Sequence, residues 1–349
     1  MPARRTFALS SVAVIGAVLL LFPVVTGMFS KAQSVDTLTG DLRASFEPDA
    51  LVQTRTDMNT VQAMADQLQA ETLPALPNAL GVPPEQFQNF MGENFPDVAS
   101  GIGQLDTILP GFQGLVTGLE TQAPNFRSAD QIPTSFLLST TVPYLFLVPG
   151  AVLFVLAAGA LIVGLNRTRS GISRVALLVS VITGVVFVIA PLILSVPAKT
   201  QAVDDLTAAF GPIFTDEGVA AVRSDMDVIQ KMSDQLQAET APALAEAMEM
   251  DPVQFQSFMG ENYPAVAAGM GQLNDILPRF QALVTGMEQN VDNFQQAASI
   301  PTATQPTTTL TWWLIVPGVA LIVLGGIGIP ATRPAEGRIT PRERTLQGV

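Results

Sequence analysis

The 349-residue chain contains no cysteine and no histidine. Without cysteine no disulfide can form, so packing alone must hold any exported domain together. Without histidine the chain lacks the commonest metal ligand and the usual general base at neutral pH. Its carboxylates show no spacing that singles out a catalytic pair. The sequence therefore predicts a non-enzymatic protein that uses neither a metal nor a cofactor.

Charge is also scarce, since 13% of the residues are charged while 48% are hydrophobic. Such a composition is typical of membrane proteins. Four uncharged apolar runs reach the roughly 20 residues that a helix needs to cross a bilayer. They cover residues 7–29, 144–165, 175–196 and 312–332. Each of them contains a proline in a corresponding place, which a membrane helix tolerates as a kink: Pro23, Pro149, Pro191 and Pro317.

The distribution of arginine predicts the orientation of these spans. Short cytoplasmic segments are enriched in basic residues. The short segments before, between and after the apolar runs carry nine of the 14 arginines: Arg4, Arg5, Arg167, Arg169, Arg174, Arg333, Arg338, Arg342 and Arg344. Both termini are therefore expected in the cytoplasm, and residues 30–143 and 197–311 outside it. The first run exceeds the 7–15 residues usual in a signal peptide, so we expect an uncleaved anchor.

The two segments expected outside the membrane carry the acidity of the protein. They hold 28 of the 30 acidic residues and only 8 of the 17 basic ones, against a net charge of −13 for the chain. An acidic surface favours cations or basic partners and disfavours nucleic acid. Arginine outnumbers lysine 14 to 3. This bias indicates a GC-rich bacterial genome, so we expect a multi-pass protein of a bacterial plasma membrane.

The sequence also repeats itself. Residues 64–134 match residues 232–302 without a gap at a spacing of 168, with 44 of 71 positions identical. The spans match less well, with 5 identities in 23 positions from Phe7 and 6 in 22 from Tyr144. We call two residues 168 apart matched positions, and the ranges 64–134 and 232–302 the first and second matched segments.

The repeat predicts an all-α membrane protein formed by tandem duplication of a span, an extracytoplasmic helical bundle and a second span. The two halves are expected to be related by a pseudo-twofold along the membrane normal. The predicted layout is repeat 1 at 1–165, with its outer domain at 30–143; a cytoplasmic linker at 166–174; repeat 2 at 175–332, with its outer domain at 197–311; and a disordered cytoplasmic tail at 333–349.

The periodicity of the outer segments is helical. Apolar residues recur at steps of three or four from Met58 to Leu76, and this helix should end near Gly81. A second, heptad-like seam runs from Met91 to Leu119, with apolar residues at alternating steps of four and three. Such a seam predicts a partner helix that packs against it. Because Pro96 and Pro110 interrupt it, the expectation is short helices or a strongly kinked rod. A short final helix is expected over 125–129. The glycine pair Gly101/Gly103, repeated at Gly269/Gly271, favours close helix packing over a phosphate loop.

The best candidate site is the block Phe-Met-Gly-Glu-Asn before Pro96, which recurs before Pro264. A polar turn there could present a carboxylate and an amide to a ligand. The alternative is a helix end followed by a new helix start. Methionines on the seams either fill the core or offer adaptable apolar contacts. The interaction candidates are Glu93, Asn94, Glu261, Asn262, Met91 and Met259.

Three function classes fit these features. The first is an envelope protein whose acidic outer domains bind a protein partner or a second copy of the chain. The second is a ligand-sensing or accessory subunit of a membrane complex. The third handles lipid or another hydrophobic ligand along the methionine seams. Ion transport is disfavoured because the spans carry no ionisable residue.

Overall fold

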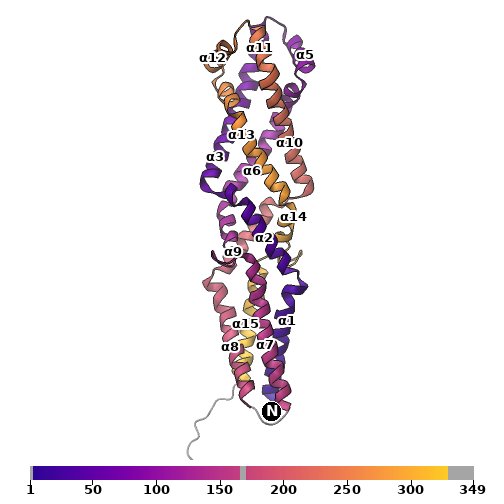
Figure 1. The fold of residues 1–349 in the computed structure, drawn as a ribbon, viewed down its shortest axis with the longest axis vertical. Coiled ribbons are helices and arrows are strands. Elements are labelled where there is room, and N and C mark those ends of the chain that lie inside the picture. Colours follow the sequence, from indigo (N-terminus) through magenta and orange to yellow (C-terminus); the bar gives the residue numbers. More distant parts are fainter. Residues whose placement is uncertain (1–2, 166–169, 329–349) are drawn as a thin grey trace, which may run out of the picture. The chain divides into compact units, whose positions relative to one another are not determined.

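The computed structural model describes residues 3–165 and 170–328, and these residues are almost entirely helical (Figure 1). No β-strand occurs among them, only two isolated bridges in the matched loops at Thr134 and Thr302. The prediction of an all-α protein is confirmed. The chain divides into two units. The apolar unit comprises residues 1–25, 144–194 and 311–349, and the bundle unit residues 26–143 and 195–310. The predicted tail at 333–349 and most of the predicted linker lie outside the described residues.

The apolar unit contains four helices that are long and apolar enough to cross a membrane, as predicted. They are α1 (Ala3–Val25), α7 (Val142–Leu165), α8 (Ser170–Ile193) and α15 (Thr309–Gly328). Two of them end a few residues earlier than the apolar runs suggested. After α1 the backbone turns at Gly27, where φ is 64°, and after α8 it turns at Ser195, where φ is 53°. A left-handed residue ends a helix even where the side chains that follow are apolar.

Glycines let the apolar helices approach closely in two matched pairs. A Cβ on Gly16 of α1 would lie 3.0 Å from the carbonyl oxygen of Gly150 on α7. A Cβ on Gly184 of α8 would lie 2.5 Å from the carbonyl oxygen of Gly318 on α15. In a bilayer, where hydrophobic burial drives helix pairing weakly, small residues at the contact permit the dispersion contacts that hold helices together.

The bundle unit consists of two similar helix series. The first contains α2 (Met28–Leu42), η1 (Arg43–Phe46), α3 (Pro48–Gln67), the π-helical turn η2 (Leu68–Thr72), α4 (Leu73–Leu80), α5 (Pro84–Asn94), α6 (Pro96–Asp130) and η3 (Ser139–Thr141). The second contains α9 (Val196–Phe210), α10 (Asp216–Gln235), the π-helical turn η4 (Leu236–Thr240), α11 (Ala241–Ala247), α12 (Pro252–Asn262), α13 (Pro264–Gln289) and α14 (Val291–Ala298). The starts of α3, α5 and α6 and those of their counterparts α10, α12 and α13 fall at matched positions.

The two series pack into each other. Helix α3 packs mainly against α13, and α10 mainly against α6, although each also touches the long helix of its own series. The rings of Phe112 on α6 and Phe280 on α13 meet edge to face, 5.8 Å apart. A single apolar core runs through both series. This packing differs from the expectation that each outer segment forms a bundle by itself, because the partner that each seam requires is supplied largely by the other segment.

Hydrogen bonds between the segments follow the same pattern. The Gln67 side-chain oxygen accepts from the backbone N–H groups of Ala265 and Val266 at the start of α13, at 2.8 and 3.2 Å. Gln235 does the same for the start of α6. Such bonds satisfy helix N–H groups that have no partner within their own helix. Lys31 donates to the carbonyl oxygens of Ser299 and Pro301, and Lys199 donates to the matched carbonyls of the first series.

The two prolines in the predicted seam behave differently. The chain breaks before Pro96, where Phe95 has a φ of −131°, since the residue before a proline avoids the helical conformation. Helix α6, 35 residues long, continues through Pro110, so of the two expectations the one of short helices broken at this proline is wrong. The buried Leu109 and Phe112 flank Pro110. Burying two such side chains contributes about 3–6 kcal/mol, enough to offset the roughly 3 kcal/mol that an interior proline costs. The expected helix at 125–129 is the end of α6 in the first series and belongs to the separate α14 in the second.

The glycine pairs support close packing, but at one glycine of each pair only. A Cβ on Gly101 would lie 2.7 Å from the Cβ of Met232, and one on Gly269 would lie 2.7 Å from the Cβ of Met64. A Cβ on Gly103 or on Gly271 would meet nothing within 4 Å. Gly101 and Gly269 therefore set the spacing between α6 and α10 and between α13 and α3.

We predict that Gly101→Ala destabilises the bundle unit by about 1–3 kcal/mol, because the added methyl group overpacks the contact with Met232. Gly103→Ala is the control, because the two glycines lie on the same helix and a methyl group on Gly103 would meet no other atom. It should leave stability unchanged or raise it by up to about 1 kcal/mol through helix propensity. Thermal unfolding of the full chain in detergent, followed by circular dichroism, measures both. Equal effects of the two substitutions would contradict the packing.

Candidate apolar binding site

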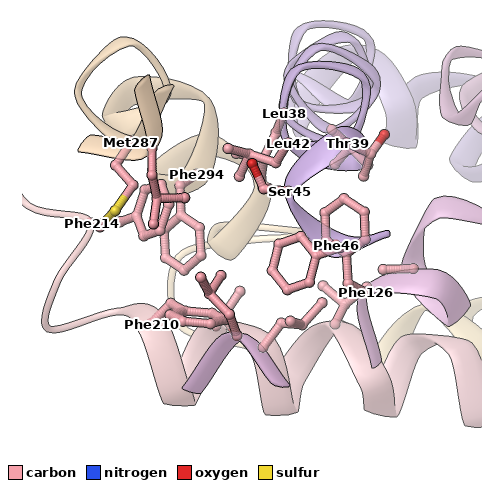
Figure 2. A pocket seen from close by; sticks show the side chains of 18 of the residues that line it. Leu38, Thr39, Leu42, Ser45, Phe46, Phe126, Phe210, Phe214, Met287 and Phe294 are labelled. Atoms are coloured by element: carbon pink, nitrogen blue, oxygen red, sulfur yellow. The ribbon is translucent and has the colours of Figure 1, made fainter. Parts of the chain in front are cut away.

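An apolar cavity of about 70 Å³ lies inside the bundle unit, between α2, α9 and α14 (Figure 2). Helices α6 and α13, the turn η1 and the turn between α9 and α10 supply the rest of its wall. Its lining comprises Val35, Leu38, Thr39, Leu42, Ser45, Phe46, Leu115, Leu119, Phe126, Ala129, Val203, Leu206, Thr207, Phe210, Phe214, Leu283, Met287, Phe294 and Ala297. Hydrocarbon side chains make up nearly all of this surface.

The lining residues fall into matched positions. Eighteen of the nineteen form nine pairs that are 168 residues apart, and seven of these pairs are identical in residue type. The two pairs that differ are Leu42 with Phe210 and Leu119 with Met287. Ser45 is the unpaired member, and its matched position is Ile213. Both series thus contribute the same chemistry to one shared cavity.

Phenylalanine rings form the most rigid part of the wall. Phe46 stacks on Phe126 with centroids 4.0 Å apart, and Phe214 stacks on Phe294 at 4.5 Å. Phe210 meets the edges of both Phe46 and Phe214 (Figure 2). Aromatic pairs in these arrangements add about 0.5–1.5 kcal/mol each beyond their buried area. The rings are therefore held in place, and the space between them does not close by side-chain rotation.

The few hydroxyl groups in the wall do not make the cavity polar. Thr39 donates to the Asp36 carbonyl oxygen at 3.4 Å, and Thr207 donates to the Asp204 carbonyl oxygen at 2.9 Å. These bonds stay within the helices that carry the two threonines. A water molecule needs two to four polar partners, and apolar cavities instead remain dry or take up hydrocarbon. The cavity is suited to an apolar guest.

Two smaller apolar cavities also lie between matched residues. One of about 20 Å³ is lined by residues of α3, α6, α10 and α13 that include Phe112 and Phe280. Another, of about 40 Å³, lies towards the α5 and α12 end, and Met91 and Met259 are in its wall. Both methionines are buried in the core. They therefore contribute to apolar packing around a cavity.

The polar candidates from the sequence lie away from these cavities. Glu93 and Glu261 are exposed on the last turns of α5 and α12. The Asn94 side chain donates to the Phe90 carbonyl oxygen at 2.9 Å, and Asn262 does the same to Phe258. The block is the end of one helix and the start of the next, as its second interpretation predicted. Within the described ranges, no group of three or more acidic side chains is placed to hold a metal ion.

A cleft of about 370 Å³, lined by both polar and apolar residues, adjoins the apolar cavity, because Ser45, Leu119 and Leu283 line both. Its charged core is Asp57 on α3, whose side chain is 2% exposed, paired with Arg279 on α13. Arg279 donates through Nε at 2.6 Å and through Nη2 at 2.9 Å. The hydrogen bonds to Asp57 raise the pKa of Arg279, so it stays protonated.

The counterpart of Asp57 has no such partner. Asp225 occupies the matched position on α10, but glycine, Gly111, stands at the position that matches Arg279. Among the described residues no hydrogen bond or ion pair involves Asp225, and partial burial raises its pKa. The ionised form of this carboxylate is therefore disfavoured in the folded protein. One series carries a neutralised carboxylate and the other an uncompensated one.

We predict that Asp225→Asn stabilises the protein at neutral pH. A folded-state pKa above the unfolded value makes the ionised group destabilising above both values, and the cost disappears as pH falls below them. The gain from the substitution should therefore shrink as the pH is lowered. Asp57→Asn is the matched control and should lose about 1–3 kcal/mol at neutral pH, because it weakens charged hydrogen bonds. Thermal unfolding between pH 7 and pH 3 checks both, and a pH-independent effect at Asp225 would refute the assignment.

Comparisons with known proteins add no relative from which a function could be transferred. No family model matches the chain, and no curated protein or solved structure is significantly similar to it. The cavity, the cleft beside it and the apolar helices are the features of the molecule that bear on its function.

Proposed function

We propose that this chain is a non-enzymatic membrane protein whose bundle unit binds an apolar chain. The observation that carries the proposal is the phenylalanine-walled cavity shared by the two helix series. The proposal keeps the third function class from the sequence, lipid or hydrophobic-ligand handling, but places the ligand in this cavity and not along the methionine seams. The seams themselves are occupied, since each packs against the other segment.

The cavity is better explained by a ligand than by loose packing. Protein interiors are close-packed, and unfilled space costs about 24 cal/mol per Å³ in core substitutions. At that rate, an empty cavity of this size costs about 2 kcal/mol. Enlarging a few side chains would remove the cost, yet Ala129 and Ala297 keep small side chains at matched positions of the wall. A hydrocarbon guest would restore the missing contacts.

A membrane lipid is the nearest source of such a chain. Helix α2, which carries Val35, begins three residues after the end of α1, and α9, which carries Val203, begins three residues after the end of α8. Two walls of the cavity thus continue directly from helices that can span a bilayer. This proximity along the chain supports an acyl chain as the guest.

The proposal includes the topology and origin of the protein. The bundle unit lies outside a bacterial plasma membrane, and both termini lie in the cytoplasm. The support is the arginine bias of the short segments and the acidity of the long ones. The two series arose by tandem duplication and are related by a pseudo-twofold along the membrane normal. The support is the 168-residue match and the matched pairs that line the cavity.

Binding of a protein partner is the second candidate. An open groove of about 580 Å³ lies between α11, α12 and α13, with Met250, Met259, Met270 and Phe255 in its wall. Methionine-lined grooves adapt to apolar helix faces. The acidic surface around the groove would complement a helix whose polar face is basic.

The topology is tested by cysteine labelling, because the native chain has no cysteine. We predict that Ser100→Cys, at an exposed position on α6, reacts with a membrane-impermeant maleimide in intact cells. Ser170→Cys, at the start of α8, should react only after the membrane is opened. The reverse pattern would place the bundle unit in the cytoplasm.

The cavity is tested with an uncharged alkyl diazirine added to the full chain in lipid nanodiscs. We predict that photolysis places adducts on peptides of α2, α6 and α9. The double substitution Ala129→Leu and Ala297→Leu should fill the cavity and reduce these adducts about tenfold, since lost burial of two or more methylene groups exceeds 1.4 kcal/mol. Peptide mass spectrometry locates and counts the adducts.

The control for this experiment is Ala241→Leu, which enlarges a residue of the smaller cavity towards the α5 and α12 end. It should leave the adducts on α2, α6 and α9 unchanged. Adducts confined to the four apolar helices of the wild-type protein would mean that the bundle unit takes up no hydrocarbon, and the proposal would fail.

A further inference from the structure

The cavity adjoins a cleft with polar residues on the side of α3 and α13. The cleft that shares Ser45, Leu119 and Leu283 with it is lined by Asp41 on α2, by Gln53, Thr54 and Asp57 on α3 and by Arg279 on α13. At the matched positions, the other side carries Ala209, Ala221, Val222, Asp225 and Gly111. Four of these five polar residues are thus replaced by apolar residues or by glycine. The cavity is therefore lined by nearly the same residue types from both series, whereas most polar residues of the cleft have no polar counterpart.

The groups in the cleft are fixed by contacts within the protein. Gln53 donates to Asp57 at 2.8 Å, in addition to the two bonds from Arg279. Asp41 accepts from the side chain of Asn290 at 3.2 Å, and Asn290 is fully buried. This bond holds the exposed Asp41 carboxylate at the rim of the cleft.

The balance of charge in the cleft is negative. Arg279 neutralises Asp57 through a bidentate pair, which leaves the Asp41 carboxylate without an opposite charge in the lining. Asp275, although not in the lining, also lies close enough to act on Arg279 electrostatically. An anionic group entering the cleft would meet like charge, whereas an ammonium group would find a carboxylate partner.

We propose that the cleft holds the headgroup of an amphiphile whose alkyl chain fills the apolar cavity, and that this headgroup carries an ammonium group facing Asp41. The inference rests on the proposed function, since it requires a chain in the cavity. It adds the chemical class of the ligand and its direction, with the head on the side of α3 and α13. A membrane lipid and a soluble alkylamine share this chemistry.

The test uses three diazirine probes with the same alkyl chain and either a primary ammonium, a sulfate or a maltoside head, on the full chain in nanodiscs of neutral lipid. The ammonium probe should give about fivefold more adducts in the bundle unit than the sulfate probe, as expected for one partly exposed charge pair worth about 1 kcal/mol. The maltoside probe should fall between them. Peptide mass spectrometry gives the yields.

The key variant combines Asp41→Ala, Gln53→Ala and Thr54→Val, which installs the residues that the matched positions already carry. It should make the ammonium and sulfate probes give about equal adduct yields. Labelling by the uncharged alkyl diazirine should continue. The control is Asp227→Ala, which removes an exposed carboxylate of α10 outside the cleft. It should leave the ratio of ammonium to sulfate adducts unchanged.

Each result separates the two proposals. A ratio that survives in the triple variant, or a preference for the sulfate, overturns the headgroup assignment and leaves the cavity intact. Loss of labelling by the uncharged probe in the wild-type protein overturns the proposed function itself. A diazirine-bearing phospholipid with an ethanolamine head, confined to the nanodisc, is compared with a diazirine-bearing octylamine added in water to separate the two sources, and labelling by either supports the site.

Discussion

The packing of α3 against α13 and of α10 against α6 is the contact on which the bundle unit depends. Each helix contributes an apolar seam that is too long for its own segment to cover, so the two segments bury each other. The same exchange explains why Gln67 and Gln235 cap helices of the opposite segment. It also explains why the glycines needed for close approach, Gly101 and Gly269, face methionines of the opposite segment. Stability of the unit is therefore a joint property of both segments.

A core shared by matched residues has a geometric consequence. Most side chains that line the space from one series have the same size in the other, so both sides leave the centre unfilled. The cavity lies where such pairs converge, and stacked rings from both series keep it from collapsing. Around this repeated frame the sequence differs mainly in polar residues. Arg279 forms a neutral ion pair with Asp57. Asp225, at the position that matches Asp57, has no such partner, because glycine stands at the position that matches Arg279.

The sequence predicted the helical class, the four apolar helices and the helix end at Gly81, because periodicity, length and glycine act locally. It did not predict which helices pair, since a heptad seam specifies a partner surface without saying which segment supplies it. It missed the cavity for a related reason. Phe46 and Phe126 are far apart in the chain, and only packing makes their rings a wall. The sequence did contain a sign of this wall, because Phe214 and Phe294 stand at the matched positions. The candidate site at Glu93 was instead predicted from the polarity of residues that are neighbours in the chain.

The matched residues of the apolar helices show where specificity is needed even within a bilayer. Few positions of the spans are identical, as expected if lipid-facing side chains only have to be apolar. Those that are identical include Gly16 with Gly184 and Gly150 with Gly318, where the helix backbones nearly touch. They also include Leu9 with Leu177 and Leu153 with Leu321, which are fully or almost fully buried between helices. Low identity in the spans therefore does not mean loose packing. At these closest contacts between helices residue identity is kept, as it is at most positions in the wall of the cavity.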